Sequence, residues 1–205
     1  MIGIIDYGVG NLFSLRSSLQ YIGKQVVVAS SEKQLAGCSH LILPGVGAFA
    51  DAVAKLHQSG LDTVVRQCAE QSMPVLGICL GMQMLFDVSY EYGQHEGLGL
   101  IGGKVVPIAP QVDPSLKIPH IGWNALHFPT YRPKSPLFRN TPEGTFVYFV
   151  HSYYATDCAP SVIATTEYGI SLTAAVSDKN VFGTQFHPEK SGDAGLEMLR
   201  AFCEI

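Results

Sequence analysis

The sequence predicts an α/β protein whose mostly parallel central sheet is flanked by helices and extended by a section of antiparallel strands. Residues 1–106 alternate short apolar runs with helical segments, and repeated strand–helix units of this size form parallel sheets with right-handed crossovers. From about residue 97, glycine and proline become frequent and short strand-like runs appear. Because the 205 residues contain no linker, internal repeat or low-complexity run, we expect one domain over residues 1–205.

The first half contains four predicted strands, each followed by a helical segment. The first helix begins after the loop Y-G-V-G and ends at Gly23, and Ser31 and Gln34 fit a capping box for a short second helix. Gly60 interrupts the long third helical region. The predicted strands are residues 1–6, 25–29, 41–43 and 74–78, and the predicted helices are residues 11–22, 31–34, 48–71 and 80–86.

The second half is predicted to be largely antiparallel and to extend the same sheet. A closing helix is expected over residues 194–202. Residues 107–140 are rich in proline, so we expect them to form loop. The predicted strands of this half are residues 100–106, 145–150, 162–166, 172–176 and 181–185.

The composition narrows the class of protein. With 47% hydrophobic and 15% charged residues and a mean hydropathy of +0.20, the chain suits a sheet covered on both faces. A net charge of −4 and a pI near 5.9 argue against general affinity for nucleic acid or anionic membranes. Met1 leads directly into a strand, and no apolar run approaches the length of a membrane span, so we expect a cytoplasmic protein.

The cysteines indicate neither a disulfide framework nor a zinc site. They are odd in number and scattered, and none forms a C-x-x-C pair. We therefore expect free thiols, no metal and no cofactor. The five are Cys38, Cys68, Cys79, Cys158 and Cys203.

Cys79 is the candidate nucleophile. It lies between the strand 74–78 and the helix 80–86, with Gly77 and Gly81 on either side. This G-x-C-x-G pattern is the cysteine counterpart of a nucleophile elbow, a tight turn that leaves little room for side chains two positions away. The start of a helix also favours the thiolate form of a nearby cysteine. The alternative is a buried structural cysteine, which is common after an apolar strand.

His187 and Glu189 are the candidate base and its orienting carboxylate. His187 ends the apolar run V-F-G-T-Q-F-H, and residues two apart on a strand point to the same side. A carboxylate beside an imidazole fixes its tautomer and stabilises the imidazolium, which predicts a triad of Cys79, His187 and Glu189. The alternative is a histidine at a strand end with a solvated glutamate.

An oxyanion hole is expected from two backbone N–H groups. Leu80 follows the nucleophile, and the loop P-G-V-G at residues 44–47 follows the third strand, where such a second donor is usual. An ordinary strand-to-helix turn is the alternative for this loop. Gly8 and Gly10 begin like a dinucleotide fingerprint, but Phe13 occupies the third glycine position, so we expect no nucleotide there.

Several motifs together resemble a class I glutamine amidotransferase of the triad type. They are G-I-C-L-G-M-Q at 77–83, P-G-V-G at 44–47 and F-H-P-E at 186–189. Further motifs resemble, more narrowly, the family of glutaminase subunits of imidazole glycerol phosphate synthase, from histidine biosynthesis. These are D-Y-G-V-G-N at 6–11, G-L-G-L-I-G-G at 97–103, P-H-I-G-W-N at 119–124, F-V-H-S-Y-Y at 149–154 and H-P-E-K-S at 187–191.

This resemblance implies a flavodoxin-like glutamine amidotransferase fold and a defined reaction. Cys79 would attack the side-chain amide of glutamine to give a glutamyl thioester and ammonia, and water would release glutamate with His187 as base. The oxyanion would be held by the N–H of Leu80 and, after a peptide reorientation within 44–47, by that of Val46. The peptide near Gly45 would act as a switch that the partner's ligand controls.

The resemblance also implies which residues hold glutamine. An α-ammonium needs an acceptor such as Glu91, and an α-carboxylate needs donors such as those of residues 151–153. The run F-D-V-S-Y-E-Y-G at 86–93 departs from the more acidic, serine-rich run of the family, although Glu91 keeps its distance from Cys79. The implied substrate-binding residues are Gly47, Gln83, Glu91, His151, Ser152 and Tyr153.

A partner is implied as well. The family's glutaminase docks on a cyclase subunit, a (β/α)8 barrel that receives the ammonia, and forms a heterodimer with it. The resemblance assigns Asn11, Trp123, Tyr148 and Lys190 to the docking face, whereas composition alone would place Trp123 in the core. A sealed interface is chemically required because ammonia that escapes into water is protonated and lost as a nucleophile.

Three other hypotheses remain open at this point. The chain could supply ammonia to another synthase, although the stretches at 6–11 and 119–124 speak against that. It could be a cysteine peptidase or a redox-sensing thiol protein that uses the same turn at Cys79. The predicted pocket for a small amino acid disfavours both. It could also be an inactive interaction module, which the filled triad positions disfavour.

Overall fold

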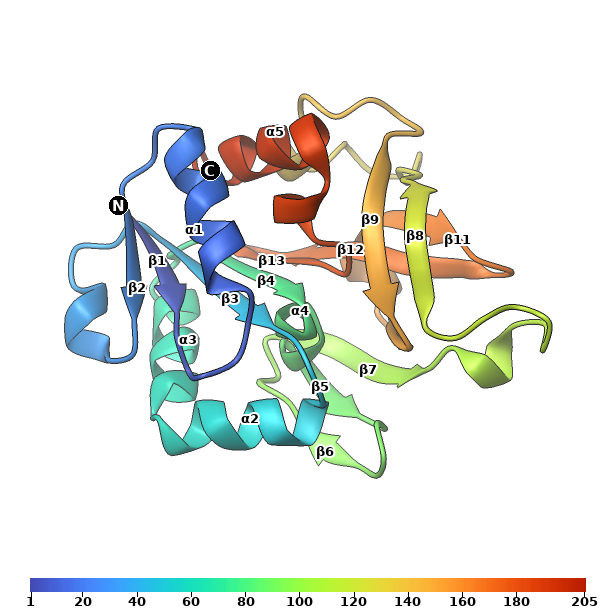
Figure 1. Cartoon of the computed structure of the whole chain (residues 1–205), viewed down its shortest axis with the longest axis horizontal. Coiled ribbons are helices and arrows are strands. Elements are labelled where there is room, and N and C mark those ends of the chain that lie inside the picture. The colour runs from blue at the N-terminus through green and yellow to red at the C-terminus, as the bar shows by residue number, and fades with distance from the viewer.

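The computed structural model describes all 205 residues, and a central seven-stranded sheet organises it (Figure 1). The strand order is β11-β12-β13-β4-β3-β1-β2. Neighbouring strands from β13 to β2 are parallel, while β12 and β11 are added antiparallel at one edge, as the sequence predicts. The strands are β1 Ile2–Ile5, β2 Val26–Ala29, β3 His40–Gly45, β4 Val75–Cys79, β11 Val162–Glu167, β12 Ser171–Asp178 and β13 Val181–Thr184.

Helices cover both faces of this sheet and create two apolar cores. Along β1, Ile2 and Ile4 belong to one core and Ile5 to the other, because successive side chains point to opposite faces. Helices α1 (Leu12–Tyr21) and α5 (Gly192–Phe202) cover the first face. Helices α2 (Phe49–Gln58), α3 (Leu61–Glu70) and α4 (Leu80–Met84) cover the second (Figure 1). None of the helices has the length and apolar composition needed to cross a bilayer.

The prediction that the second half extends the same sheet is only partly right. A separate four-stranded sheet has the order β10-β7-β5-β6, and β8 pairs with β9 as a two-stranded ribbon that stands across the end of the central sheet (Figure 1). Apart from the local pairing of β5 with β6, these strands pair with segments farther away in the sequence, which local patterns do not reveal. They are β5 Phe86–Ser89, β6 His95–Glu96, β7 Ile101–Pro107, β8 His120–Ala125, β9 Phe146–His151 and β10 Tyr153–Thr156.

Local predictions fail where tertiary contacts override propensity. The helix predicted to reach residue 86 ends at Met84, because Phe86 is fully buried and begins β5. The segment 107–140, predicted as loop, contains β8, which exists only through its pairing with β9. The capping box of Ser31 and Gln34 is absent, because the Gln34 side chain accepts the N–H of Ser30, although the short helix predicted here does form, as the 3₁₀ helix Glu32–Leu35.

The carboxyl ends of β3, β4 and β13 lie side by side because these three strands are adjacent and parallel. In open α/β sheets this edge is where ligands bind. The loop 44–47, Cys79 and the segment that leads to His187 all leave the sheet there. The topology therefore brings three segments that are distant in sequence to one place.

Candidate active site

Cys79 ends β4 in a strained backbone conformation, with φ 55° and ψ −113°. Such conformations persist only where the surroundings enforce them, and they occur often at functional sites. A Cβ atom on Gly81 would lie 1.9 Å from the carbonyl oxygen of Leu43, and one on Gly77 would lie 2.6 Å from that of Gly81. Both glycines are therefore required by close backbone approach, as the G-x-C-x-G pattern predicts.

His187 and Glu189 form a buried pair beside this turn. The Nδ1 atom of His187 is 2.8 Å from Oε1 of Glu189, and each side chain is 3% exposed. The sequence interpretation was wrong in one respect: β13 ends at Thr184, and Glu189 lies on the 3₁₀ helix Pro188–Lys190, not on a strand. The alternative of a solvated glutamate is also wrong.

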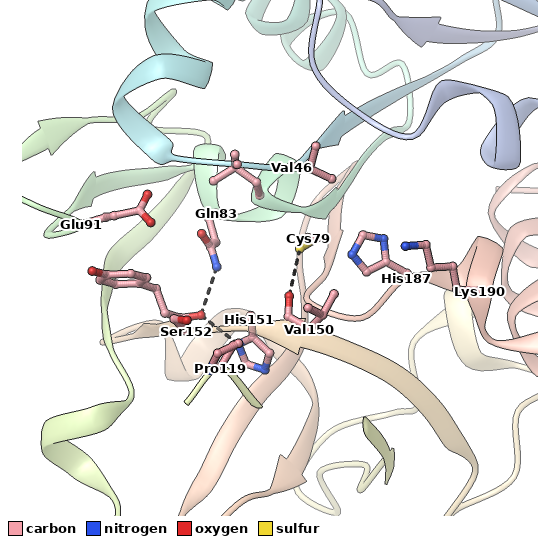
Figure 2. A pocket seen from close by; sticks show the side chains of 13 residues that line it. Val46, Cys79, Gln83, Glu91, Pro119, Val150, His151, Ser152, His187 and Lys190 are labelled. Atoms are coloured by element: carbon pink, nitrogen blue, oxygen red, sulfur yellow. Dashed lines mark hydrogen bonds between the residues drawn. The ribbon is translucent and has the colours of Figure 1, made fainter. Parts of the chain in front are cut away.

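The charge state of His187 follows from its neighbours. Burial alone would lower its pKa, but hydrogen bonding to Cys79 and Glu189, together with their negative charges, raises the pKa to about 9. His187 is therefore protonated at neutral pH and can donate a proton before it accepts one. Figure 2 shows its ring and the Cys79 sulfur facing each other.

A tyrosine that the sequence interpretation did not select holds the loop 44–47. The hydroxyl of Tyr7 donates to the carbonyl of Pro44 at 2.8 Å, and Tyr7 is buried. Burial and the nearby Cys79 charge raise the pKa of Tyr7, so it stays a neutral donor. Its position within the D-Y-G-V-G-N motif is the only signal that could have identified it.

A cavity of about 380 Å³ opens beside the sulfur. It is lined by Cys79 and His187, by the predicted oxyanion residues Val46 and Leu80, and by all six predicted substrate residues. The sequence interpretation missed Pro119 and Val150, which contribute to the wall through non-local pairing. The predicted substrate residues in the lining are Gly47, Gln83, Glu91, His151, Ser152 and Tyr153.

Glu91 lies at the opposite end of the cavity from the sulfur (Figure 2). One of its carboxylate oxygens accepts the N–H of Phe49, the first residue of α2, where a helix N-terminus favours negative charge. The aromatic ring of Tyr92 packs edge-on against that of Tyr153, with centroids 6.3 Å apart. Although residues 86–93 depart from the usual run of the family, Glu91 still lines the cavity. The Tyr92 ring packs against Tyr153, which also lines it.

His151 is held by a buried hydrogen-bonded chain that reaches β8. Its Nδ1 is 2.9 Å from the carbonyl of Tyr153, its Nε2 is 3.0 Å from Nδ1 of His120, and Nε2 of His120 is 2.8 Å from Oδ1 of Asn124. Asn124 in turn donates to the carbonyl of Glu167 at 3.0 Å. The sequence interpretation did not select His120, although it lies in the P-H-I-G-W-N motif.

This chain is short of one proton at neutral pH. Burial lowers the pKa of His151 to about 3, against the opposing effect of the Tyr153 carbonyl, and burial also lowers the pKa of His120. Two neutral imidazoles supply two protons, whereas their three contacts need one each. One of these three contacts is therefore left without a proton.

The predicted docking residues are placed in two groups. Trp123 is 52% exposed, so the core alternative is wrong, and its ring lies 6.1 Å from that of Tyr148 on the paired strand. The Nζ atom of Lys190 lies 5.7 Å from the centroid of the Tyr148 ring, and Lys190 also lines the cavity. Asn11 is the N-cap of α1, where its side chain accepts the N–H of Ser14, and it lines a small cavity together with His187 and Glu189.

The model of the family described as glutamine amidotransferase class-I matches residues 3–205. The chain therefore belongs to the class I glutamine amidotransferases, enzymes that release ammonia from glutamine.

Curated relatives narrow the position within this class. The chain is 47% identical over 205 residues to the imidazole glycerol phosphate synthase subunit HisH of Moorella thermoacetica, covering 100% of this chain and 94% of the relative. It is 48% identical over 209 residues to the HisH subunit of Geobacillus sp. strain WCH70, covering 100% and 97%. The HisH subunit of Wolinella succinogenes is 42% identical over 207 residues, with both chains fully covered.

Solved structures agree on the fold. A crystal structure described as glutamine amidotransferase superposes with a TM-score of 0.76 at 19% identity, covering 99% of this chain and 97% of that one. The PurLQS structure from Thermotoga maritima gives 0.77 at 18% identity, covering 99% and 97%. At such low identity the similarity establishes the architecture alone.

Proposed function

We propose that this chain is the glutaminase subunit of imidazole glycerol phosphate synthase, acting in the cytoplasm in histidine biosynthesis. It would hydrolyse glutamine to glutamate and ammonia as a single glutaminase domain, without a cofactor, and pass the ammonia to a cyclase subunit. The observation that carries the proposal is the sulfur of Cys79 facing the buried His187–Glu189 pair at a cavity, in a chain 42–48% identical to HisH subunits over its whole length.

The first half-reaction begins with the thiolate of Cys79 and protonated His187. The sulfur attacks the side-chain amide carbon of glutamine, and the carbonyl oxygen becomes an oxyanion that accepts the N–H groups of Leu80 and, after the 44–47 loop reorients, Val46. His187 then gives its proton to the amide nitrogen, which leaves as ammonia. The products are a thioester on Cys79 and a neutral imidazole.

The second half-reaction restores the enzyme. Neutral His187 removes a proton from water, and the oxygen attacks the thioester carbon. Collapse of the tetrahedral intermediate breaks the carbon–sulfur bond and releases glutamate, with the thiolate as leaving group. Glu189 keeps the imidazole in the orientation that both proton transfers need, and its charge stabilises the protonated form.

The cavity suits an amino acid with its amide toward the sulfur. Glu91 lies at the far end and can accept the α-ammonium of glutamine, because one of its oxygens remains available after the contact with Phe49. Ser152 and the backbone of residues 151–153 would donate to the α-carboxylate, and Gln83 and Gly47 would bound the side chain. His151 is neutral, so it adds no positive charge to this end of the site.

The partner would be a cyclase of (β/α)8-barrel fold, docked on the outer face of the β8–β9 ribbon. Every second residue of β8 and β9 points to this outer face, and many of these residues are apolar. Ile121, Trp123 and Phe146 are each more than half exposed. An exposed apolar face of this kind commonly marks an interface. Tyr148 and Lys190 connect the face to His187, since the Tyr148 ring lies 6.4 Å from the His187 ring. Ammonia formed at the sulfur could therefore leave under the partner without crossing open water.

The test is glutamate release from glutamine by the purified chain, alone and with a cyclase barrel that carries its nucleotide ligand. We expect stimulation of about a hundredfold or more, which corresponds to about 2.7 kcal/mol of transition-state stabilisation. Steady hydrolysis that ignores the barrel would assign the chain to a different synthase. No hydrolysis under either condition would refute the glutaminase assignment.

A further inference from the structure

Gln185 is a fully buried residue that none of the steps above uses. It lies between β13 and His187, is 0% exposed and does not line the cavity. Its Nε2 atom is 3.7 Å from the Cys79 sulfur, and its Oε1 atom is 3.0 Å from Nε2 of Gln83. A buried amide is retained only where its polar atoms have partners, and here one partner is the reacting atom.

The orientation of the Gln185 amide is fixed by a backbone carbonyl. Nε2 of Gln83 is 3.1 Å from the carbonyl of Tyr153, which can only accept a hydrogen bond. The opposite orientation of Gln83 would set two oxygens against each other at that distance, so its NH₂ group must face Tyr153. The second proton of this NH₂ group then goes to Oε1 of Gln185, and the NH₂ group of Gln185 is left facing the sulfur.

The other neighbours of the sulfur divide into donors and acceptors. The carbonyl of Val150 is 3.9 Å away and can only accept, so it suits a protonated thiol and repels a thiolate. Protonated His187 donates, and so does the Gln185 amide. After the sulfur ionises, two hydrogen-bond donors therefore stabilise its negative charge. The Gln185 amide is the one that does not transfer its proton during the reaction.

We propose that Gln185 is a further catalytic residue, whose amide N–H donates to the Cys79 sulfur and stabilises and positions the thiolate. It acts before the sulfur attacks the glutamine amide and again when the thioester expels the sulfur. This inference deepens the glutaminase reaction proposed above. It rests on that proposal for the identity of the substrate, while the donor–sulfur contact stands on geometry alone.

A purely supporting role makes a different prediction. If Gln185 only holds Gln83 in place, its loss would disturb the cavity wall, raise KM for glutamine and leave the reactivity of the sulfur unchanged. A donor to the thiolate would instead change the sulfur itself, in the absence of any substrate. Reactivity of Cys79 toward a small electrophile separates the two roles.

The experiment uses Gln185→Met, which removes the amide at similar length, and Gln185→Glu, which is isosteric and keeps an acceptor for Gln83. Alkylation by iodoacetamide is followed by mass spectrometry on the peptide that contains Cys79, because four other cysteines are present. Gln67→Glu, an exposed change on α3, is the matched control. Thermal unfolding of each variant establishes that it is folded.

We expect the pH profile of Cys79 alkylation to lie about one unit higher in Gln185→Met, a tenfold change that corresponds to about 1.4 kcal/mol. In the complex, kcat should fall by a similar factor, while KM for glutamine in Gln185→Glu stays near that of the unaltered chain. An unchanged pH profile in folded Gln185→Met overturns the proposal. Because alkylation needs neither glutamine nor a partner, this result does not depend on whether the glutaminase assignment holds.

Discussion

Substitution of Glu189 by glutamine isolates the electrostatic contribution of the buried carboxylate. The amide keeps an oxygen that can accept the N–H of His187 Nδ1, so the ring can stay in place, but the negative charge is lost. Both side chains are 3% exposed, which means that water does not replace the missing interaction. The imidazolium is then supported by the Cys79 sulfur alone.

The size of the effect follows from the contact. A hydrogen bond to a charged group contributes about 1.5–3 kcal/mol, and the bond between Nδ1 and Oε1 is 2.8 Å long. One pKa unit corresponds to about 1.36 kcal/mol, so the pKa of His187 should fall by about 1–2 units from its value of about 9. The direction is downward because the carboxylate favours the protonated form.

The assay is the pH dependence of kcat/KM for glutamate release in the complex, between about pH 5.5 and 10. Ammonia departs with the proton of His187, so activity of the unaltered chain should decline as the pH rises through about 9. In Glu189→Gln the same decline should begin about 1–2 units lower. Glu197→Gln, at a partly exposed residue on α5 that pairs with Arg200, is the matched control and should leave the profile unchanged.

An unchanged high-pH limb in Glu189→Gln would refute this reasoning, because the decline would then belong to a group other than His187. A uniform loss of kcat at all pH values, with the limb still near pH 9, would mean that the carboxylate orients the ring without setting its charge. A low-pH limb that moves instead would show that the proton is needed on a different residue.

Three further predictions concern the nucleophile, the elbow and the docking face. Cys79→Ala should abolish synthesis from glutamine in the complex but leave synthesis from added ammonia intact, and loss of both would make Cys79 structural. Gly81→Ala places a Cβ 1.9 Å from the Leu43 carbonyl, so thermal unfolding should show a loss above about 3 kcal/mol, and an unchanged Tm would contradict the close approach. Trp123→Ala should weaken partner binding by about 2 kcal/mol or more, roughly thirtyfold in calorimetry. Tyr131→Ala, at an aromatic residue that is even more exposed but lies off the ribbon, should not.

Residues near one another in the sequence account for the features that were predicted correctly. The alternation of strands and helices over the first half, the turn at Cys79 and the interruption at Gly60 each depend on a few neighbouring residues. Gly60 has φ 71°, a conformation that glycine adopts readily, and it separates α2 from α3 as predicted. The proximity of His187 to Glu189 was also predicted, although from a strand pattern, whereas Glu189 lies on the 3₁₀ helix Pro188–Lys190.

The sequence by itself predicted the class of fold and the candidate nucleophile and base, since each is encoded in a short motif. Only the tertiary structure decided which strands left the central sheet, how β8 and β9 pair, and that Gln185 and His120 reach the site. Those outcomes depend on contacts between segments tens of residues apart, such as Gln185 with Cys79 at a separation of 106. Local propensity carries no record of such contacts, because their free energy comes from burial and hydrogen bonding that exist only once the chain is folded.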